Sequence, residues 1–371
     1  MSKALRVVFT EEDTLFRLQE MALLRRLTPQ GEKTLNYFFG QDIQPALTRL
    51  TSLADRLGLP ASIDTLVCED EATLDANLGQ ADMLVAETTE LTAARLQQGK
   101  GRLKLVQKFG RDCHNINVDA AVALGIPVAN LVRFSSLSSA DHITTLILAL
   151  ARRLIPAHLS VVNRRDASQP AQFEQAPPRN KFNWAGIKGI RVLAEQTLGF
   201  IGLGENSGEV ARRMRMLGMR VLYTKRNRLS AADEKALGGV EYVSLDQLLA
   251  QSDFVSIHVP YGKETEKMIG QEALAKMKPD AYLVNSARGG IVDEVALYEA
   301  LKNHRIAGAA LDVYRFEPVP AQCPLLELDN VLWTPHISGG EPEFMIRESE
   351  DVLSNMARVL RGEKPIGLQS A

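Results

Sequence analysis

Two patterns of apolar and polar positions follow one another along the first third of the chain. Short runs rich in valine, isoleucine and leucine have the composition of buried strands. The segments between them repeat apolar residues every three to four positions, as helices do. Strands that alternate with helices form a parallel sheet covered on both faces. The predicted strands are 5–10, 63–67, 83–86, 103–108 and 127–129.

Two helical stretches in this region are unusually long. Residues 14–59 are mostly helical in pattern, with an expected break at 29–31, and 17–59 is interpreted as an added helical piece. One long helix is expected at 138–158. The polar, proline-containing segment 163–184 that follows predicts a surface connection.

A second strand-and-helix rhythm runs from residue 197 to 335. Six strands in one block are the number of a complete doubly wound domain. They are predicted at 198–201, 220–223, 254–258, 282–285, 308–313 and 331–334. The helical tail at 341–361 is short for an independent unit and is expected to pack on the first domain.

We therefore predict an α/β protein with two doubly wound, parallel-sheet (Rossmann-like) domains. The first domain would comprise 1–134, completed by 338–371, and the second domain would comprise 135–337. A length of 371 residues agrees with two domains of roughly 150 residues or more each.

Composition narrows the class of protein. Lys and Arg number 43 and Asp and Glu 45, so the net charge of −2 gives no global reason to expect nucleic acid or an anionic membrane as partner. The amino terminus lacks a signal-peptide core, and no apolar run approaches the roughly 18 residues of a membrane helix. The widely spaced Cys68, Cys113 and Cys323 argue against a disulfide framework and a zinc site. We expect a reduced, soluble, cytoplasmic protein without a metal.

A glycine-bearing turn follows the predicted strand 198–201. Gly202 permits a tight strand-to-helix turn, and Gly204 allows backbone N–H groups to approach a pyrophosphate at the start of the helix. The third position of this fingerprint, usually glycine or alanine, is Ser207. The strand before the turn and the helix after it favour a dinucleotide site over an ordinary glycine turn.

The tip of the next strand indicates which dinucleotide binds. NAD sites carry an acidic residue about 20 positions beyond the glycines, where it bonds the ribose 2′-hydroxyl. This tip instead carries Lys225, Arg226 and Arg228, which could pair with the 2′-phosphate of NADP. We predict NADP; the alternative is NAD beside a solvated basic loop.

Three polar residues follow strands of the second domain, where ligands of open α/β sheets bind. They are Arg288, Glu317 and His336. An arginine can hold a carboxylate in a bidentate fork and polarise a keto oxygen. A histidine can protonate the alkoxide left by hydride addition, and a carboxylate can orient its imidazole. Together these residues suit reduction of a 2-keto acid.

Several long motifs in this order resemble the D-isomer-specific 2-hydroxyacid dehydrogenase family, in particular its glyoxylate and hydroxypyruvate reductases. The resemblance extends over 103–362, and its motifs are TLGFIGLG, HVP, NSARGGIVDE, GAALDV and TPHISGG. It implies a two-domain enzyme with an interdomain cleft, a 2-keto or D-2-hydroxy acid as substrate, and a homodimer formed through the cofactor domain.

The resemblance also implies individual roles. Arg288 would bind substrate, His336 would be the acid/base paired with Glu317, and Asp312 would contact the nicotinamide carboxamide. Asp141-His142 stand where the family often has Glu-His. The first domain would bind substrate through Phe109, Gly110 and Arg111. The other expected cofactor residues are Gly202, Gly204, Glu205, Asn206, Lys225, Arg226, His258, Val259, Pro260, Ser286, Ala287, Ser338 and Gly339.

Two departures from the family pattern bear on the ligands. In the stretch 110–115, where the family often has Gly-x-Gly-aromatic-Asp-Asn, Asp112 replaces the second glycine and His114 the aspartate. Asp112 could repel a carboxylate, whereas Arg111 or His114 could bind an additional anionic group. Alternatively, these side chains point outward and only the backbone amides bind. Glu205 is unfavourable beside a pyrophosphate, so we expect it to point to solvent.

Four functions remain open from the sequence. The first is reduction of a 2-keto acid with NADPH, and the second is the same chemistry with NAD in the oxidising direction. The third is a dinucleotide-sensing partner protein, like the corepressors built on this scaffold. The fourth is an oxidoreductase for a substrate such as formate or phosphite, although the pair of Glu317 and His336 argues against the formate pattern. The site chemistry favours the first.

Overall fold

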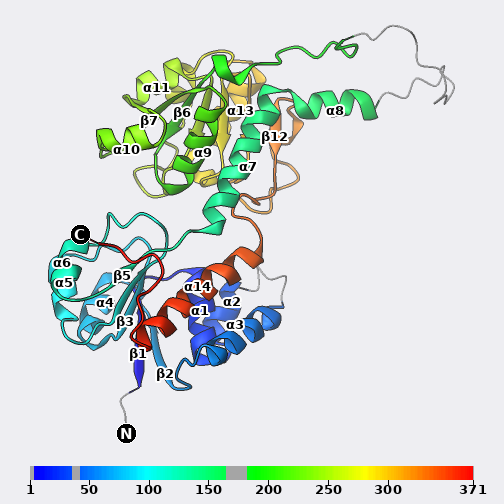
Figure 1. The fold of residues 1–371 in the computed structure, drawn as a ribbon. Coiled ribbons are helices and arrows are strands. Elements are labelled where there is room, and N and C mark those ends of the chain that lie inside the picture. Colours follow the sequence, from blue (N-terminus) through cyan, green and yellow to red (C-terminus); the bar gives the residue numbers. More distant parts are fainter. Residues whose placement is uncertain (1–3, 36–41, 164–181, 371) are drawn as a thin grey trace. The chain divides into compact units, whose positions relative to one another are not determined.

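Two parallel sheets organise the part of the chain that this computed structural model describes, residues 4–35, 42–163 and 182–370. The chain divides into unit 1, Met1–Ser135 with Gly340–Ala371, and unit 2, Ser136–Gly339 (Figure 1). Each unit has helices on both faces of its sheet, which confirms the predicted fold class.

The sheet of unit 1 has five strands in the order β2-β1-β3-β4-β5. One face packs against α1 (Thr14–Leu24), α3 (Gln44–Arg56) and α14 (Pro342–Leu360), and the other against α4 (Glu71–Asn77), α5 (Ala93–Gln98) and α6 (Val118–Ala123). Alternation along β1 explains this, because Val7 and Phe9 point to the first face and Val8 to the second. The strands are β1 (Leu5–Phe9), β2 (Ile63–Val67), β3 (Met83–Ala86), β4 (Leu105–Lys108) and β5 (Val128–Ala129).

The helices between β1 and β2 correct one prediction. The break expected at 29–31 lies earlier, because α1 ends at Leu24, Arg25 adopts a left-handed backbone (φ 55°), and α2 (Pro29–Leu35) begins at the proline itself. A proline fits the first turn of a helix because its missing N–H has no intrahelical acceptor there. The tail folds back as predicted, since α14 packs against α1 and α3.

The sheet of unit 2 has seven strands in the order β12-β11-β10-β9-β6-β7-β8. All six predicted strands are present. The sequence missed β8 (Glu241–Tyr242), a two-residue edge strand with both residues exposed and therefore no apolar pattern. The others are β6 (Thr197–Ile201), β7 (Arg220–Thr224), β9 (Phe254–Ile257), β10 (Tyr282–Asn285), β11 (Gly308–Leu311) and β12 (Val331–Trp333).

Helices cover both faces of this sheet as well. One face packs against α7 (Phe134–Ala151) and α9 (Glu205–Met216). The other packs against α11 (Leu245–Gln251), α12 (Gln271–Lys276) and α13 (Glu294–Lys302). The short α10 (Ala231–Ala236) follows β7 and buries none of its residues.

The single helix predicted at 138–158 is instead two helices. α7 is followed by α8 (Leu154–Val162) at an angle of 65°, and Arg153 between them has a left-handed backbone (φ 52°). Pro156, the third residue of α8, marks this break, because a proline interrupts a helix but fits the first turn of a new one. No single helix in the described ranges is long and apolar enough to cross a membrane, although this bent pair reaches the required length and composition together. Most of the connection predicted at 163–184 lies outside the described residues.

Candidate functional site

The predicted glycine turn joins β6 to α9 in unit 2. Gly202 has φ 90°, and a Cβ there would lie 2.6 Å from the carbonyl oxygen of His258, so no larger residue fits. A Cβ at Gly204 would meet nothing within 4 Å, which leaves space in front of the first turn of α9. Ser207 fits the third position because its hydroxyl accepts the Gly204 N–H at 2.8 Å.

A cavity of about 550 Å³ opens beside this turn. Residues from the start of α9 and from the loops after β9 and β10 line it, and α7 closes it. The first N–H groups of a helix have no intrahelical acceptors, so the lining fits the phosphates of a dinucleotide. The lining residues are Ser139, Ile143, Gly204, Glu205, Asn206, Ser207, His258, Val259, Pro260, Tyr261, Ser286, Ala287 and Arg288.

Two predicted cofactor residues need comment. Glu205 was expected to point to solvent, but it is half-buried and lines the cavity as the first residue of α9, where the helix dipole favours a carboxylate. His258 lies 2.8 Å from the Ser256 hydroxyl, and its ring meets Phe200 edge-on. Burial lowers the pKa of His258 to about 3, so its imidazole is neutral.

The three basic residues beyond β7 already have partners within unit 2. The Lys225 ammonium donates to the Leu203 carbonyl at 3.1 Å and is half-buried. Arg226 is exposed and pairs with Glu264. Arg228 pairs with Glu234 at 2.8 Å. Lys225 and Arg226 do not line the cavity, and neither do Gly202, Asp312, Ser338 and Gly339.

His336 and Glu317 form a close pair. His336 Nδ1 lies 2.6 Å from Glu317 Oε2, and both side chains are partly exposed. The Tyr314 N–H donates to the other carboxylate oxygen of Glu317 at 3.0 Å and fixes it. His336 itself has a left-handed backbone, φ 54°.

Asp312 holds the turn that carries His336. One of its oxygens accepts the Thr334 hydroxyl at 2.6 Å and the Ile337 N–H at 3.0 Å, and the other accepts the Ser338 N–H at 3.0 Å. Burial alone would raise the pKa of Asp312, but these hydrogen bonds and one from His142 hold it far below its usual range. The carboxylate is fully buried and charged.

Arg288 follows β10 and faces the cavity. Asn285 fixes its backbone by donating to the Arg288 carbonyl at 3.1 Å and accepting the Ala287 N–H at 3.1 Å. The guanidinium is exposed, and one nitrogen donates to the Ala287 carbonyl at 2.6 Å. Because β10, β11 and β12 are parallel neighbours, the residues that follow them lie at one edge of the sheet.

Comparison with known proteins identifies the family. Residues 144–338 match the family model described as the NAD-binding domain of D-isomer specific 2-hydroxyacid dehydrogenases. A glyoxylate reductase from Korarchaeum cryptofilum is 38% identical over 287 residues, 77% of this chain and 82% of that protein. The chain belongs to the D-isomer specific 2-hydroxyacid dehydrogenase family. It is therefore an NAD(P)-dependent dehydrogenase.

Two further proteins are similar to this dehydrogenase, one of them longer and the other a solved structure of lower sequence identity. A D-3-phosphoglycerate dehydrogenase from Archaeoglobus fulgidus is 36% identical over 321 residues, which are 84% of this chain but only 56% of that protein. The solved PH0520 protein from Pyrococcus horikoshii is 25% identical, with a TM-score of 0.59 over 99% of this chain and 96% of its own.

The residues expected to bind substrate in unit 1 of the dehydrogenase have different surroundings. The Phe109 ring is buried in the core, 5.8 Å from the ring of Phe16, so its side chain is not available to a ligand. Gly110 has φ 121°, and Arg111 is exposed. Asp112 and His114 are exposed and pair with each other at 2.8 Å.

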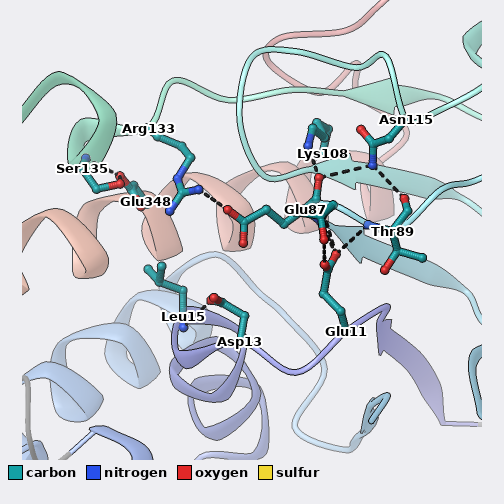
Figure 2. Close-up of polar contacts among 11 residues, drawn as sticks. Glu11, Asp13, Leu15, Glu87, Thr89, Lys108, Asn115, Arg133, Ser135 and Glu348 are labelled. Carbon is teal, nitrogen blue, oxygen red and sulfur yellow. Dashed lines mark hydrogen bonds and ion pairs between the residues drawn. The ribbon is translucent and has the colours of Figure 1, made fainter. Parts of the chain in front are cut away.

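Sequence reasoning missed a polar cluster in unit 1, shown in Figure 2. One Glu11 oxygen accepts three consecutive N–H groups, those of 87–89, at 2.8 to 3.1 Å. Lys108 and Asn115 both donate to the Glu87 carbonyl. The only signal in the sequence is that charged residues directly follow β3 and end β4.

The second part of this cluster surrounds Arg133 (Figure 2). Its guanidinium pairs with Glu87 and also attracts Asp13 and Glu348. Burial raises the pKa of each of these three carboxyls. Glu348 is fully buried on α14 and accepts the N–H and hydroxyl of Ser135, at 2.8 and 3.0 Å, so it caps the start of α7.

Proposed function

We propose that this dehydrogenase reduces a small 2-keto acid to the D-2-hydroxy acid with NADPH. The observation that carries the proposal is the pair of His336 and Glu317, 2.6 Å apart, at the sheet edge that also bears Arg288 and the cavity. The 38% identical glyoxylate reductase supports a small keto acid as substrate. We also propose that unit 1 binds the substrate and that unit 2 binds the cofactor. We propose a cytoplasmic location for the protein.

The residues of this site divide the chemistry between them. The bound cofactor supplies a hydride to C2 of the keto acid. Arg288 holds the substrate carboxylate and polarises the keto oxygen. His336 donates a proton from Nε2 to the oxygen as it becomes an alkoxide, while Glu317 orients the ring through Nδ1. In unit 1, the backbone of Phe109, Gly110 and Arg111 is the proposed carboxylate contact.

A panel of keto acids tests the reaction class. Loss of reduced-nicotinamide absorbance is followed with glyoxylate, hydroxypyruvate, pyruvate, phenylpyruvate and a branched 2-keto acid, each with NADPH and NADH. Turnover of any member, faster with NADPH, is the expected result. Cofactor binding without turnover of any member would contradict the proposal and favour a dinucleotide-sensing protein.

The preference for NADPH rests on the tip of β7. In the double variant Lys225→Asp and Arg226→Ala, the Kd of NADPH should rise at least about tenfold, because each charge-assisted bond to the 2′-phosphate contributes about 1.5–3 kcal/mol. The Kd of NADH should change little. Titration of cofactor fluorescence measures both values, and Arg220→Ala, which should change neither, is the control because Arg220 lies at the opposite end of β7 and pairs with Glu241. Equal weakening of both cofactors would show that this tip does not distinguish them.

The dehydrogenase is further proposed to form a homodimer through α8. None of the α8 residues is buried, and Leu154, Ile155, Leu159, Val161 and Val162 are 43–56% exposed. Several exposed apolar side chains on one helix are typical of an interface.

Light scattering should therefore give a dimer for the wild type and a monomer for Leu159→Asp, because the new charge would be buried without a partner. Val295→Asp, at a residue 73% exposed on α13, is the control and should stay dimeric. A monomeric wild type would contradict the proposed assembly.

A further inference from the structure

A second histidine, His142, contacts the residues that hold the turn carrying His336. His142 lies on α7, is 15% exposed, and places Nε2 3.1 Å from the Thr334 hydroxyl oxygen and 3.3 Å from Asp312 Oδ1. Its neighbours Ser139 and Ile143 on the same helix line the cavity. α7 thus contacts both the cavity and the support of the His336 turn.

The hydrogen bonds define which nitrogen of His142 carries a proton. The Thr334 hydroxyl has one hydrogen, and the 2.6 Å contact to the charged Asp312 carboxylate uses it. Thr334 Oγ1 can then only accept from His142, so Nε2 of His142 is the donor. His142 therefore donates from Nε2 to the Thr334 hydroxyl oxygen, and Asp312 Oδ1 lies close to the same nitrogen.

The backbone of His336 depends on this support. A left-handed conformation is unfavourable for a residue with a Cβ and persists only where its surroundings impose it. Asp312 contacts both sides of the residue, through the Thr334 hydroxyl before it and the N–H groups of Ile337 and Ser338 after it. Any shift of Asp312 or Thr334 therefore moves the imidazole of His336.

We propose that His142 is a positioning residue, which holds Thr334 and Asp312 so that His336 stays in the geometry needed to donate its proton. This role rests on the proposed function of His336. Among the described residues the hydrogen bonds of His142 go to Thr334 and Asp312 and that of the His336 ring goes to Glu317, so His142 acts through the turn.

The test compares single and double variants in the full-length protein, with NADPH and the fastest keto acid of the panel. His142→Ala and Thr334→Val should each lower kcat by about 10- to 100-fold, as small displacements of a reacting group do. The Kd of NADPH should stay unchanged. His142→Gln, whose amide can still donate to Thr334, should restore most of the lost kcat. The double variant should be no slower than the slower single variant, because both residues act through one contact.

One control variant accompanies this test. Asp141→Ala changes the neighbouring residue, which is exposed and pairs with Arg213, and should leave kcat unchanged. Losses that multiply in the double variant, or an equal rise in the Kd of NADPH, would overturn the positioning role. If His142→Ala fails to fold, the nearly isosteric Thr334→Val carries the test alone, and wild-type kcat in that variant would overturn the proposal. Full activity of a His336 variant would instead remove the proposed function itself.

Discussion

Replacement of His336 by asparagine should lower kcat by about 100- to 10,000-fold, the usual contribution of a positioned general acid. An amide cannot supply the proton that the alkoxide requires. Asparagine is chosen because it tolerates the left-handed backbone of this residue, φ 54°, better than alanine does. The Kd of the cofactor should not change, because His336 does not line the dinucleotide cavity. Stopped-flow and steady-state absorbance of the reduced nicotinamide measure both effects.

The chain offers a matched control for this experiment. His304 also has a left-handed backbone, φ 52°, but lies at the exposed end of α13, so His304→Asn should keep wild-type kcat. A comparable loss of kcat and of cofactor affinity in His336→Asn would contradict an acid/base role, because it would indicate a general disturbance of unit 2.

Arg288→Ala should reduce kcat/KM by about 100- to 10,000-fold, since two hydrogen bonds to a charged carboxylate contribute about 1.5–3 kcal/mol each. Arg288→Lys should recover only a small part, because an ammonium cannot form the planar bidentate fork. The measurement is steady-state kinetics with each member of the keto acid panel.

Two comparisons sharpen this second prediction. Arg305→Ala, which removes an exposed arginine at the far end of α13, should leave kcat/KM unchanged. Arg288→Ala should also lose affinity for a keto acid but not for a neutral aldehyde, which lacks the carboxylate. Equal losses for the acid and the aldehyde would indicate that Arg288 does not bind the carboxylate.

The strands and the glycine turn were predictable because each has a local signal. The six strands of unit 2 are apolar runs, and Gly202 precedes a helix at the end of one of them. The break between α7 and α8 also has a local signal, Pro156 as the third residue of α8, which the sequence analysis did not use. The true end of α1 has no such signal, because Arg25 is a non-glycine residue in a left-handed conformation, φ 55°.

The polar networks were beyond sequence reasoning for a related reason. His142, Asp312 and Thr334 are brought together by the fold, although up to 192 positions separate them in the chain. The resemblance to the family pointed to Asp312 but could not show that its carboxylate supports the turn of His336. In unit 1, the contacts of Glu11 and Arg133 likewise depend on which loops meet at one edge of the sheet (Figure 2).

The cap that Glu348 places on Ser135 has a consequence for biosynthesis. Unit 2 is one uninterrupted segment, Ser136–Gly339, and all its strands are translated before Glu348. Unit 1 needs α14, because Glu348 accepts the N–H of Ser135 and the Asn355 amide donates to the side chain of Gln107 on β4 at 2.8 Å. The first part of unit 1 is translated before unit 2, but one face of its sheet stays uncovered until α14 is made. Unit 2 can therefore complete its fold before unit 1 does.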